Sequence, residues 1–151
     1  MNFEVQYERH FRMVWNLCCT YLKHPADTED AVQEVFLRLA QCTKRFQSHD
    51  HERAWLITTA KNVCRDELKR ARRRELSLED HDASVPGPKL DETLEALRAL
   101  PEKYQTPLYL HYYEGLPVAQ IALLLNRRES TIRSDLHRGR LLLKKELEGA
   151  R

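Results

Sequence analysis

The side chains with the clearest chemical potential are positive charges grouped in two stretches. Residues 53–74 carry eight lysines and arginines against two acids, a net charge of +6, and residues 127–145 carry seven against two, a net charge of +5. Between them, residues 75–102 carry a net charge of −6. Guanidinium and ammonium groups bind phosphate oxygens, and arginine can also bond the edge of guanine in the major groove. The alternation indicates two phosphate-facing surfaces joined by a segment that avoids phosphate.

The first basic stretch, ERAWLITTAKNVCRDELKRARRR, has the periodicity of one long helix. Small and apolar residues recur at steps of three and four, namely Ile57, Ala60, Cys64, Leu68 and Ala71. That spacing predicts a face packed on a core. The same spacing relates Lys61, Arg65, Lys69 and Arg72, with Asn62 beside them. We therefore expect a second, opposite face that meets a polyanion or solvent.

The second basic stretch belongs to a predicted helix-turn-helix. Val118, Ile121, Ala122 and Leu125 line one side of a short helix. Asn126 can adopt the left-handed conformation at its end, and Glu129 or Ser130 can start a longer helix. In a helix-turn-helix the second helix enters the major groove. Its N-terminal half offers groups that bond bases or phosphates, namely Thr131, Arg133, Ser134, His137 and Arg138. Ordinary helical hairpins share the apolar spacing, and the clustered arginines favour DNA binding.

The remaining elements predict an all-α fold of two small domains. We expect helices from Phe3 to Leu22, from Asp27 or Thr28 onward, around residues 90–100, and from Glu102 to Glu114. Pro107 indicates a late start or a kink in the last of these, and Gly115 a C-cap. Residues 77–89 are acidic and contain Pro86, Gly87 and Pro88, so they read as a linker between domains at residues 1–76 and 90–151.

Composition excludes several kinds of protein. The four cysteines, Cys18, Cys19, Cys42 and Cys64, have no C-x-x-C spacing, so we expect buried free thiols in a cytoplasmic protein rather than a metal site or disulfides. No apolar run approaches ~18 residues and no signal peptide is evident, so no membrane insertion is expected. There is no glycine-rich phosphate loop and no nucleophile with a nearby base. The sequence therefore predicts neither an enzyme nor a cofactor.

Four segments carry a resemblance to a known family: DTEDAVQEVFLRL, the basic helix quoted above, ALRALPEKYQTPLYLHYYEGLPVAQIALLL and STIRSDLHRGRLLLKKEL. The chain resembles the small bacterial sigma factors of the extracytoplasmic-function type, members of the sigma-70 family that keep only regions two and four. The resemblance covers nearly the whole chain in the family's order. It implies a subunit that directs RNA polymerase core to promoters and assists strand opening, while the core does the chemistry.

The resemblance also implies roles for individual residues. Docking on the clamp of the largest polymerase subunit would involve Asp30, Gln33, Glu34 and Leu37. The loop from Arg45 to His51 would form a pocket for a flipped base of the minus-ten element, whose extraction costs a few kcal/mol. The minus-ten contacts would be Arg45, Phe46, Ser48, His49, Lys61, Asn62, Arg65 and Lys69. The minus-thirty-five contacts would be Thr131, Arg133, Ser134, His137 and Arg138. Further expected partners are the flap of the second-largest subunit and an anti-sigma factor.

Two residues depart from the family's pattern, and one rival function stays open. Asp135 stands where the family usually has a basic residue, which would weaken one phosphate contact and could pair with a neighbouring arginine. Pro117 replaces the usual Ser or Thr cap. The rival is a DNA-binding regulator that acts without polymerase through the helix-turn-helix alone. That function would leave the DAVQEVF surface and the basic helix around Trp55 without a role.

Overall fold

The computed structural model describes residues 2–76 and 88–149, and there the chain consists of seven α-helices and no strands. It divides into an N-terminal unit, Met1–Pro88, and a C-terminal unit, Lys89–Arg151. The all-α prediction is thus confirmed. Most of the predicted linker, residues 77–87, lies outside the described residues. None of the described helices combines the length and the apolar character that a membrane crossing requires.

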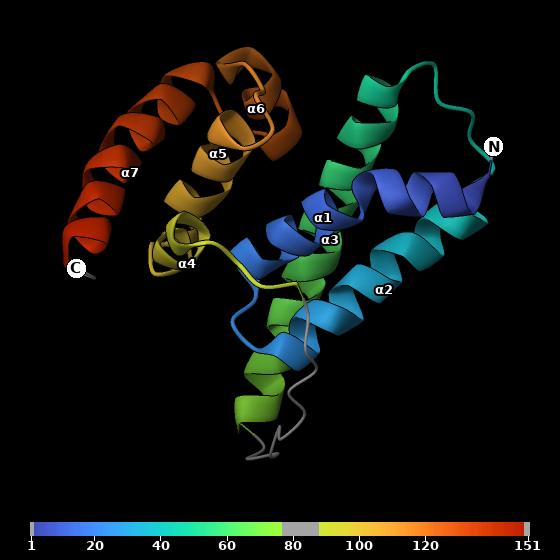
Figure 1. Cartoon of the computed structure of the whole chain (residues 1–151), viewed down its shortest axis with the longest axis horizontal. Helices are drawn as coiled ribbons and strands as arrows, with labels where there is room; N and C mark the ends of the chain where they lie inside the picture. The colour runs from blue at the N-terminus through green and yellow to red at the C-terminus, as the bar shows by residue number, and fades with distance from the viewer. Residues whose placement is uncertain (1, 77–87, 150–151) are drawn as a thin grey trace. The chain divides into compact units, whose positions relative to one another are not determined.

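The N-terminal unit is a three-helix packing of α1 (Phe3–Tyr21), α2 (Pro25–Gln41) and α3 (His49–Leu76), in which every pair of helices is in contact. Figure 1 shows the three helices running past one another in blue, cyan and green. Each helix contributes its apolar stripe to one core. The most deeply buried members are Val14, Leu17 and Cys18 of α1, Ala31 and Val35 of α2, and Leu56, Ile57, Ala60 and Cys64 of α3.

Pro25 begins α2, two or three residues before the start that the sequence predicted at Asp27 or Thr28. The reason is that proline is well suited to the first turn of a helix, where its missing N–H has no partner to lose. His24 precedes it in an extended conformation and gives no side-chain cap. Asp27 and Thr28 are buried inside the first turn and a half instead.

A buried carboxylate joins α1 to α3. Glu52 is 0% exposed. It accepts a hydrogen bond from Gln6 Nε2 at 3.1 Å, lies 2.7 Å from His10 Nε2, and pairs with Arg9 Nη1 at 3.5 Å. Burial lowers the pKa of His10 below its ordinary 6.5 although the hydrogen bond to Glu52 raises it. His10 is therefore mainly neutral at neutral pH, and Glu52 is held by a hydrogen-bonded network rather than by two full cations.

The cysteines are free thiols in the described structure, and three of the four, all except Cys42, are buried. Cys18 and Cys64 meet in the core of the N-terminal unit. Their hydrogen bond and their burial raise the pKa of the Cys18 thiol well above its ordinary value. A thiol in this setting stays protonated and packs as a small apolar group. The expectation of buried structural cysteines is confirmed for Cys18, Cys19 and Cys64.

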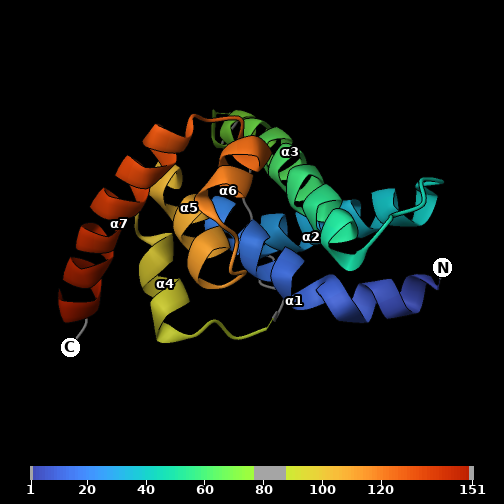
Figure 2. The ribbon, with the colours of Figure 1, turned by 90° about the horizontal axis from the view of Figure 1, so that it is seen from above.

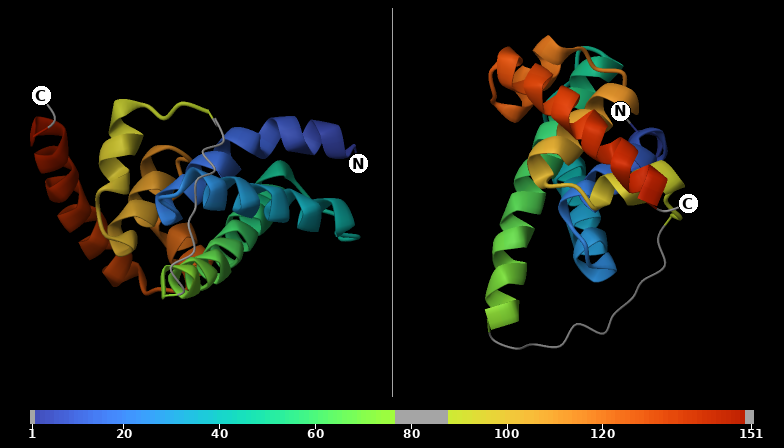
Figure 3. Two further views of the ribbon diagram at one scale, coloured as in Figure 1. Left: turned by 90° about the horizontal axis from the view of Figure 1, so that it is seen from below. Right: turned by 90° about the vertical axis from the view of Figure 1, so that its left-hand side faces the viewer.

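The C-terminal unit contains α4 (Glu92–Arg98), α5 (Glu102–Tyr112), α6 (Val118–Leu125) and α7 (Glu129–Gly149). The long helix α7 packs against each of the other three, as the views in Figures 2 and 3 make visible. Asp91 caps α4 by accepting from Leu94 N at 2.7 Å, and it also accepts from the Tyr113 hydroxyl at 3.0 Å. Burial, followed by the Asp91 interaction, raises the pKa of Tyr113 to about 12, so this hydroxyl keeps its proton and remains a donor.

Pro107 lies inside α5 and neither delays nor ends it. A proline in a helix has no N–H for the carbonyl four residues earlier, which here is the carbonyl of Lys103. The guanidinium of Arg127 supplies the missing donor, because its Nη1 lies 3.0 Å from Lys103 O. Arg127 belongs to the turn between α6 and α7. The sequence expectation of a late start at Pro107 is therefore wrong. The carbonyl that Pro107 leaves without a helical donor is bonded by a residue twenty positions beyond the proline.

The turn of the helix-turn-helix forms as the sequence predicted. Asn126 has φ 56° and ψ 49°, the left-handed conformation. Its neighbour Arg127 donates from its backbone N to Ala122 O at 3.0 Å, which closes the end of α6. Pro117 precedes α6 without a side-chain cap, but its carbonyl accepts from Gln120 N at 3.0 Å and Ile121 N at 3.1 Å. The substitution of the usual hydroxyl cap by proline therefore leaves α6 with a regular first turn.

Candidate nucleic-acid interface

The first half of α7 has one buried side and one exposed side. Ile132 and Leu136 are buried against the rest of the C-terminal unit. All five residues predicted to contact the minus-thirty-five element are exposed on the other side, namely Thr131, Arg133, Ser134, His137 and Arg138. Among the described residues, Arg133 has one ion pair, a long one to Glu129 of 3.9 Å from Nη1 to Oε1, so its guanidinium is available to a ligand. The helix thus presents these donors on an exposed surface.

Asp135 does not interrupt this surface. It is 6% exposed and faces inward, where its Oδ2 lies 3.6 Å from Arg127 Nη1. The expected pairing with a neighbouring arginine is thus present. The carboxylate lies beside Thr131, Ser134 and Arg138, and its charge is matched there by Arg127. Asp135 acts within the unit, because it pairs with the Arg127 guanidinium, which in turn donates to the Lys103 carbonyl of α5.

The basic face of α3 is formed by its exposed residues, which include Asn62, Arg65, Lys69 and Arg72. Lys61 is the exception, because it is only 8% exposed. At about 100° per residue, Lys61 lies only about 40° around the helix from buried Ile57, whereas Arg65 and Lys69 lie about 80° and 120° away. The expectation that Lys61 belongs to an opposite, exposed stripe is therefore wrong. The cationic surface borders the apolar stripe, and Lys61 falls on the buried side of that border.

The loop before α3 carries the other predicted minus-ten residues. Arg45, Ser48 and His49 are exposed, and Phe46 is half-buried with its ring edge-on to those of Trp55 and His51, at centroid distances of 5.7 and 5.4 Å. Ser48 caps α3, since its Oγ accepts from His51 N at 3.1 Å and its carbonyl accepts from Glu52 N at 3.1 Å. This loop is therefore held to the start of α3 by both ring packing and a cap.

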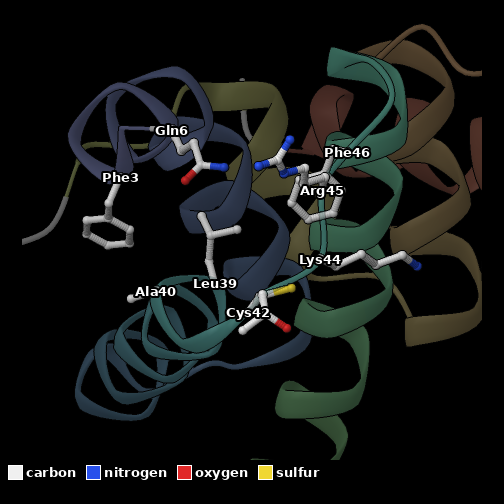
Figure 4. A pocket seen from close by; sticks show the side chains of 9 residues that line it. Phe3, Gln6, Leu39, Ala40, Cys42, Lys44, Arg45 and Phe46 are labelled. Atoms are coloured by element: carbon white, nitrogen blue, oxygen red, sulfur yellow. The ribbon is translucent and has the colours of Figure 1, made fainter.

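A hollow of about 590 Å³ lies between this loop and the helices α1 and α2. Figure 4 shows it from close by, with Phe3 and Gln6 of α1 on one side and Arg45 and Phe46 of the loop on the other. The amide of Gln6 and the guanidinium of Arg45 point toward the same space, while the amine of Lys44 points away. The hollow therefore combines aromatic walls with hydrogen-bonding groups.

The predicted docking residues Asp30, Gln33, Glu34 and Leu37 lie on the outer side of α2. Asp30, Gln33 and Leu37 are exposed and Glu34 is half-exposed. Leu37 is 51% exposed and borders an apolar hollow of about 380 Å³ that also includes Phe3, Tyr7 and Phe36. Asp30 lies in a cluster of carboxylates with Asp27 and Glu67, whose ligand oxygens are within 4.8 Å of one another. Arg70 Nη2 pairs with Glu67 at 2.9 Å and reduces the negative charge there.

Sequence reasoning missed several residues that the structure places at these surfaces. Phe3 and Tyr7 border the apolar hollow beside Leu37, and Lys103 of α5 lies beside the exposed side of α7. Phe3 and Tyr7 follow the helical period of α1, but that period does not indicate that both are exposed. The sequence does not indicate that Lys103 lies next to α7, because that position depends on how α5 and α7 pack against each other.

Two family models match the chain. The model of Sigma-70 region 2 matches residues 6–74, and that of Sigma-70, region 4 matches residues 90–143. One match falls in each structural unit, and each includes one of the exposed basic surfaces. The fold and these surfaces thus define a sigma-70-type protein with one region-2 unit and one region-4 unit.

Similar proteins and structures narrow the family. The ECF RNA polymerase sigma factor SigL of Mycobacterium tuberculosis (strain ATCC 25618 / H37Rv) is 31% identical over 142 residues, covering 87% of this chain and 80% of SigL. The ECF RNA polymerase sigma factor SigX of Bacillus subtilis (strain 168) is 24% identical over 162 residues, covering 97% and 84%. The chain belongs to the ECF RNA polymerase sigma factors, as its motifs predicted.

Two solved structures share the fold. RpoE of Bartonella quintana, in complex with the anti-sigma factor NepR, superposes with a TM-score of 0.74 at 21% identity, covering 99% of this chain and 98% of that one. CnrH, in complex with the cytosolic domain of CnrY, gives a TM-score of 0.62 at 21% identity, covering 97% and 88%. At this identity the likeness concerns the arrangement of helices and not the identity of contact residues.

Proposed function

We propose that this chain directs RNA polymerase core to specific promoters in the cytoplasm and assists strand opening, with no bond chemistry of its own. The main support is that this ECF sigma factor exposes hydrogen-bond donors on α7, the second helix of its helix-turn-helix. The N-terminal unit carries a second basic helix, α3. Two DNA surfaces on one chain suit two promoter elements. The outer side of α2, with exposed Leu37, supports a docking role for Asp30, Gln33 and Glu34.

The first test is run-off transcription with purified core polymerase from the protein's own organism and a pool of its genomic promoter fragments. We expect transcripts that appear only when the protein is added and whose start sites share two spaced motifs. The control is core polymerase alone on the same pool. If no transcript appears although the protein shifts duplex DNA, the proposal fails in favour of a regulator that acts without polymerase.

We assign unit-specific roles within this function. The N-terminal unit contacts the minus-ten element through Asn62, Arg65 and Lys69, and the hollow beside Arg45 and Phe46 receives a base that has left the stack. The aromatic and hydrogen-bonding groups around that hollow suit a base, which offers a flat ring and polar edges. Lys61 is buried, so it is not assigned to DNA.

Polymerase docking is testable by a double substitution on α2. The change Asp30→Ala with Gln33→Ala removes two exposed polar groups, and we expect weaker binding to core polymerase with unchanged affinity for duplex DNA. Competition with a labelled sigma factor for core, read by fluorescence anisotropy, measures the effect. Glu8→Ala, an exposed acidic position on α1, is the matched control. Equal core affinity of the double variant and the wild type would rule out this surface.

Recognition of the minus-thirty-five element is testable at Arg133. An arginine that bonds a guanine edge contributes about 1–3 kcal/mol of discrimination. Arg133→Ala should therefore weaken holoenzyme binding to duplexes carrying the minus-thirty-five motif by that amount and relax preference at one position. Lys145→Ala, exposed near the end of the same helix, is the control. A loss of equal size on every sequence would assign Arg133 to phosphate instead of a base.

An anti-sigma factor is a further proposed partner, supported by the two solved structures of similar fold, each of which is a complex with a second protein. Such a partner would prevent the chain from binding core. A purified candidate should abolish the protein-dependent run-off transcripts when added at equal molar amount. A candidate that binds the chain but leaves transcription intact would not have this role.

A further inference from the structure

The guanidinium of Arg127 is already occupied within the C-terminal unit. Its Nη1 donates to Lys103 O at 3.0 Å, at the carbonyl left without a helical donor by Pro107, and lies 3.6 Å from Asp135 Oδ2. Only 19% of the Arg127 side chain and 8% of the Asp135 side chain are exposed. The positive charge of Arg127 is therefore largely matched by Asp135, and its geometry is set by α5 and α7.

Beside this pair lies a shallow hollow of about 490 Å³. Its border brings together a lysine of α5 and the exposed side of α7, namely Lys103, Ser130, Thr131, Ser134 and Arg138. Arg127 and Asp135 line it too, which makes three hydroxyls, three cations and one carboxylate, and Asp135 is paired with Arg127. In the part of the chain that the structure describes, no ion pair involves Lys103 or Arg138. The unmatched charge of the hollow is thus positive.

Hydroxyls interspersed with unpaired cations are the groups that proteins use to hold nucleic-acid phosphates, whereas base reading is done by side chains that reach into the groove. Lys103 comes from outside the two helices of the helix-turn-helix. A cation that flanks the recognition helix from a neighbouring element meets the sugar-phosphate chain beside the groove, because the groove itself is occupied by the recognition helix.

We propose that this hollow binds the phosphate chain of duplex DNA next to α7, with Lys103 as a phosphate contact that the helix-turn-helix alone does not supply. The inference rests on the proposed function, because it requires that the C-terminal unit binds duplex DNA. The Lys103 amine also lies 4.9 Å from the centroid of the Tyr104 ring, a cation–π contact that restrains its stem while leaving its hydrogens for an anion. The pairing of Arg127 with Asp135 leaves Lys103 and Arg138 as the charges that face the phosphates.

The test uses holoenzyme assembled from the full chain and core polymerase, with two labelled duplexes: the promoter found by run-off transcription and a shuffled sequence of equal length. Dissociation constants are measured over a series of salt concentrations. Lys103→Gln keeps a polar side chain, shorter by one atom, and removes its charge. We expect it to weaken binding to both duplexes by the same factor and to reduce the slope of log Kd against log salt by about 0.9, the value for one phosphate contact.

The matched control is Lys144→Gln, which removes an exposed lysine in the second half of α7, away from the hollow, and should leave the slope unchanged. An unaltered slope in Lys103→Gln, or a loss confined to the promoter duplex, would overturn the inference. Absence of duplex binding by the wild-type holoenzyme would overturn it too. If protein-dependent run-off transcripts appear while the slope stays unaltered, the proposed function stands and only the phosphate site fails.

Discussion

Replacing Glu52 by alanine is expected to lower the free energy of unfolding of the N-terminal unit by about 3 kcal/mol or more. The carboxylate is 0% exposed and is the shared acceptor for Gln6 and His10 of α1. Its removal takes away the carboxylate oxygens that these buried groups bond, at a cost of about 1–3 kcal/mol each, and opens a cavity as well. Because the network joins α1 to α3, the loss concerns the packing of the whole unit.

Chemical denaturation followed by tryptophan fluorescence measures this effect without interference from the C-terminal unit. Both tryptophans of the chain, Trp15 and Trp55, lie in the N-terminal unit, so the fluorescence transition reports that unit alone. Asp66→Ala, an exposed acid on the same helix, is the matched control and should change the free energy by less than about 0.5 kcal/mol. A Glu52→Ala transition that coincides with that of Asp66→Ala would show that the network contributes little to stability.

Replacing Gly139 by valine is expected to destabilise the C-terminal unit by about 1–3 kcal/mol through overpacking. At Gly139, α7 passes close to α5: a Cβ there would lie 2.8 Å from Leu108 Cδ1 and 3.2 Å from Tyr104 Cβ. Glycine inside a helix is ordinarily unfavourable relative to alanine by roughly 0.5–1 kcal/mol. Replacing Gly139 should therefore favour the helical conformation of α7. If the substitution nevertheless destabilises the unit, the loss reports the close approach of α7 to α5.

Far-UV circular dichroism with tryptophan fluorescence separates the two units in this experiment. Gly139→Val should shift the part of the dichroism transition that fluorescence does not follow, and leave the fluorescence transition in place. Gly149→Val is the control, because a Cβ at Gly149 meets no atom within 4 Å. If both glycine variants unfold at the same denaturant concentration, α7 does not depend on close packing at Gly139.

Periodicity in the sequence was sufficient for the elements that pack on their own neighbours. The stripe through Ile57, Ala60 and Cys64 is buried as predicted, and Asn126 adopts the predicted left-handed turn. These features are local, because each depends on the spacing of residues within one helix or on one backbone conformation. The same is true of the exposed side of α7, which follows from the burial of Ile132 and Leu136.

The errors arose where a residue's environment depends on another helix. Lys61 has the same spacing as the other basic residues of α3, but it lies on the buried side of the helix. The pattern of charges alone does not show where that buried side ends. For Asp135 the sequence predicts a pairing with a neighbouring arginine, but only the structure identifies that partner as Arg127 of the α6–α7 turn. Likewise, the expected late start at Pro107 is wrong because the Lys103 carbonyl receives its donor from Arg127 of the α6–α7 turn, which lies twenty residues beyond Pro107 in sequence.

The bond from Arg127 to the Lys103 carbonyl sets a limit on how this protein could be recombined with its relatives. A chimera that exchanges α6 and α7 for helices joined by a turn without this arginine would leave the Lys103 carbonyl, four residues before Pro107, without its donor. A segment transplanted for promoter choice should therefore begin at Glu102, because α5 with its proline and the arginine of the turn form one hydrogen-bonded unit.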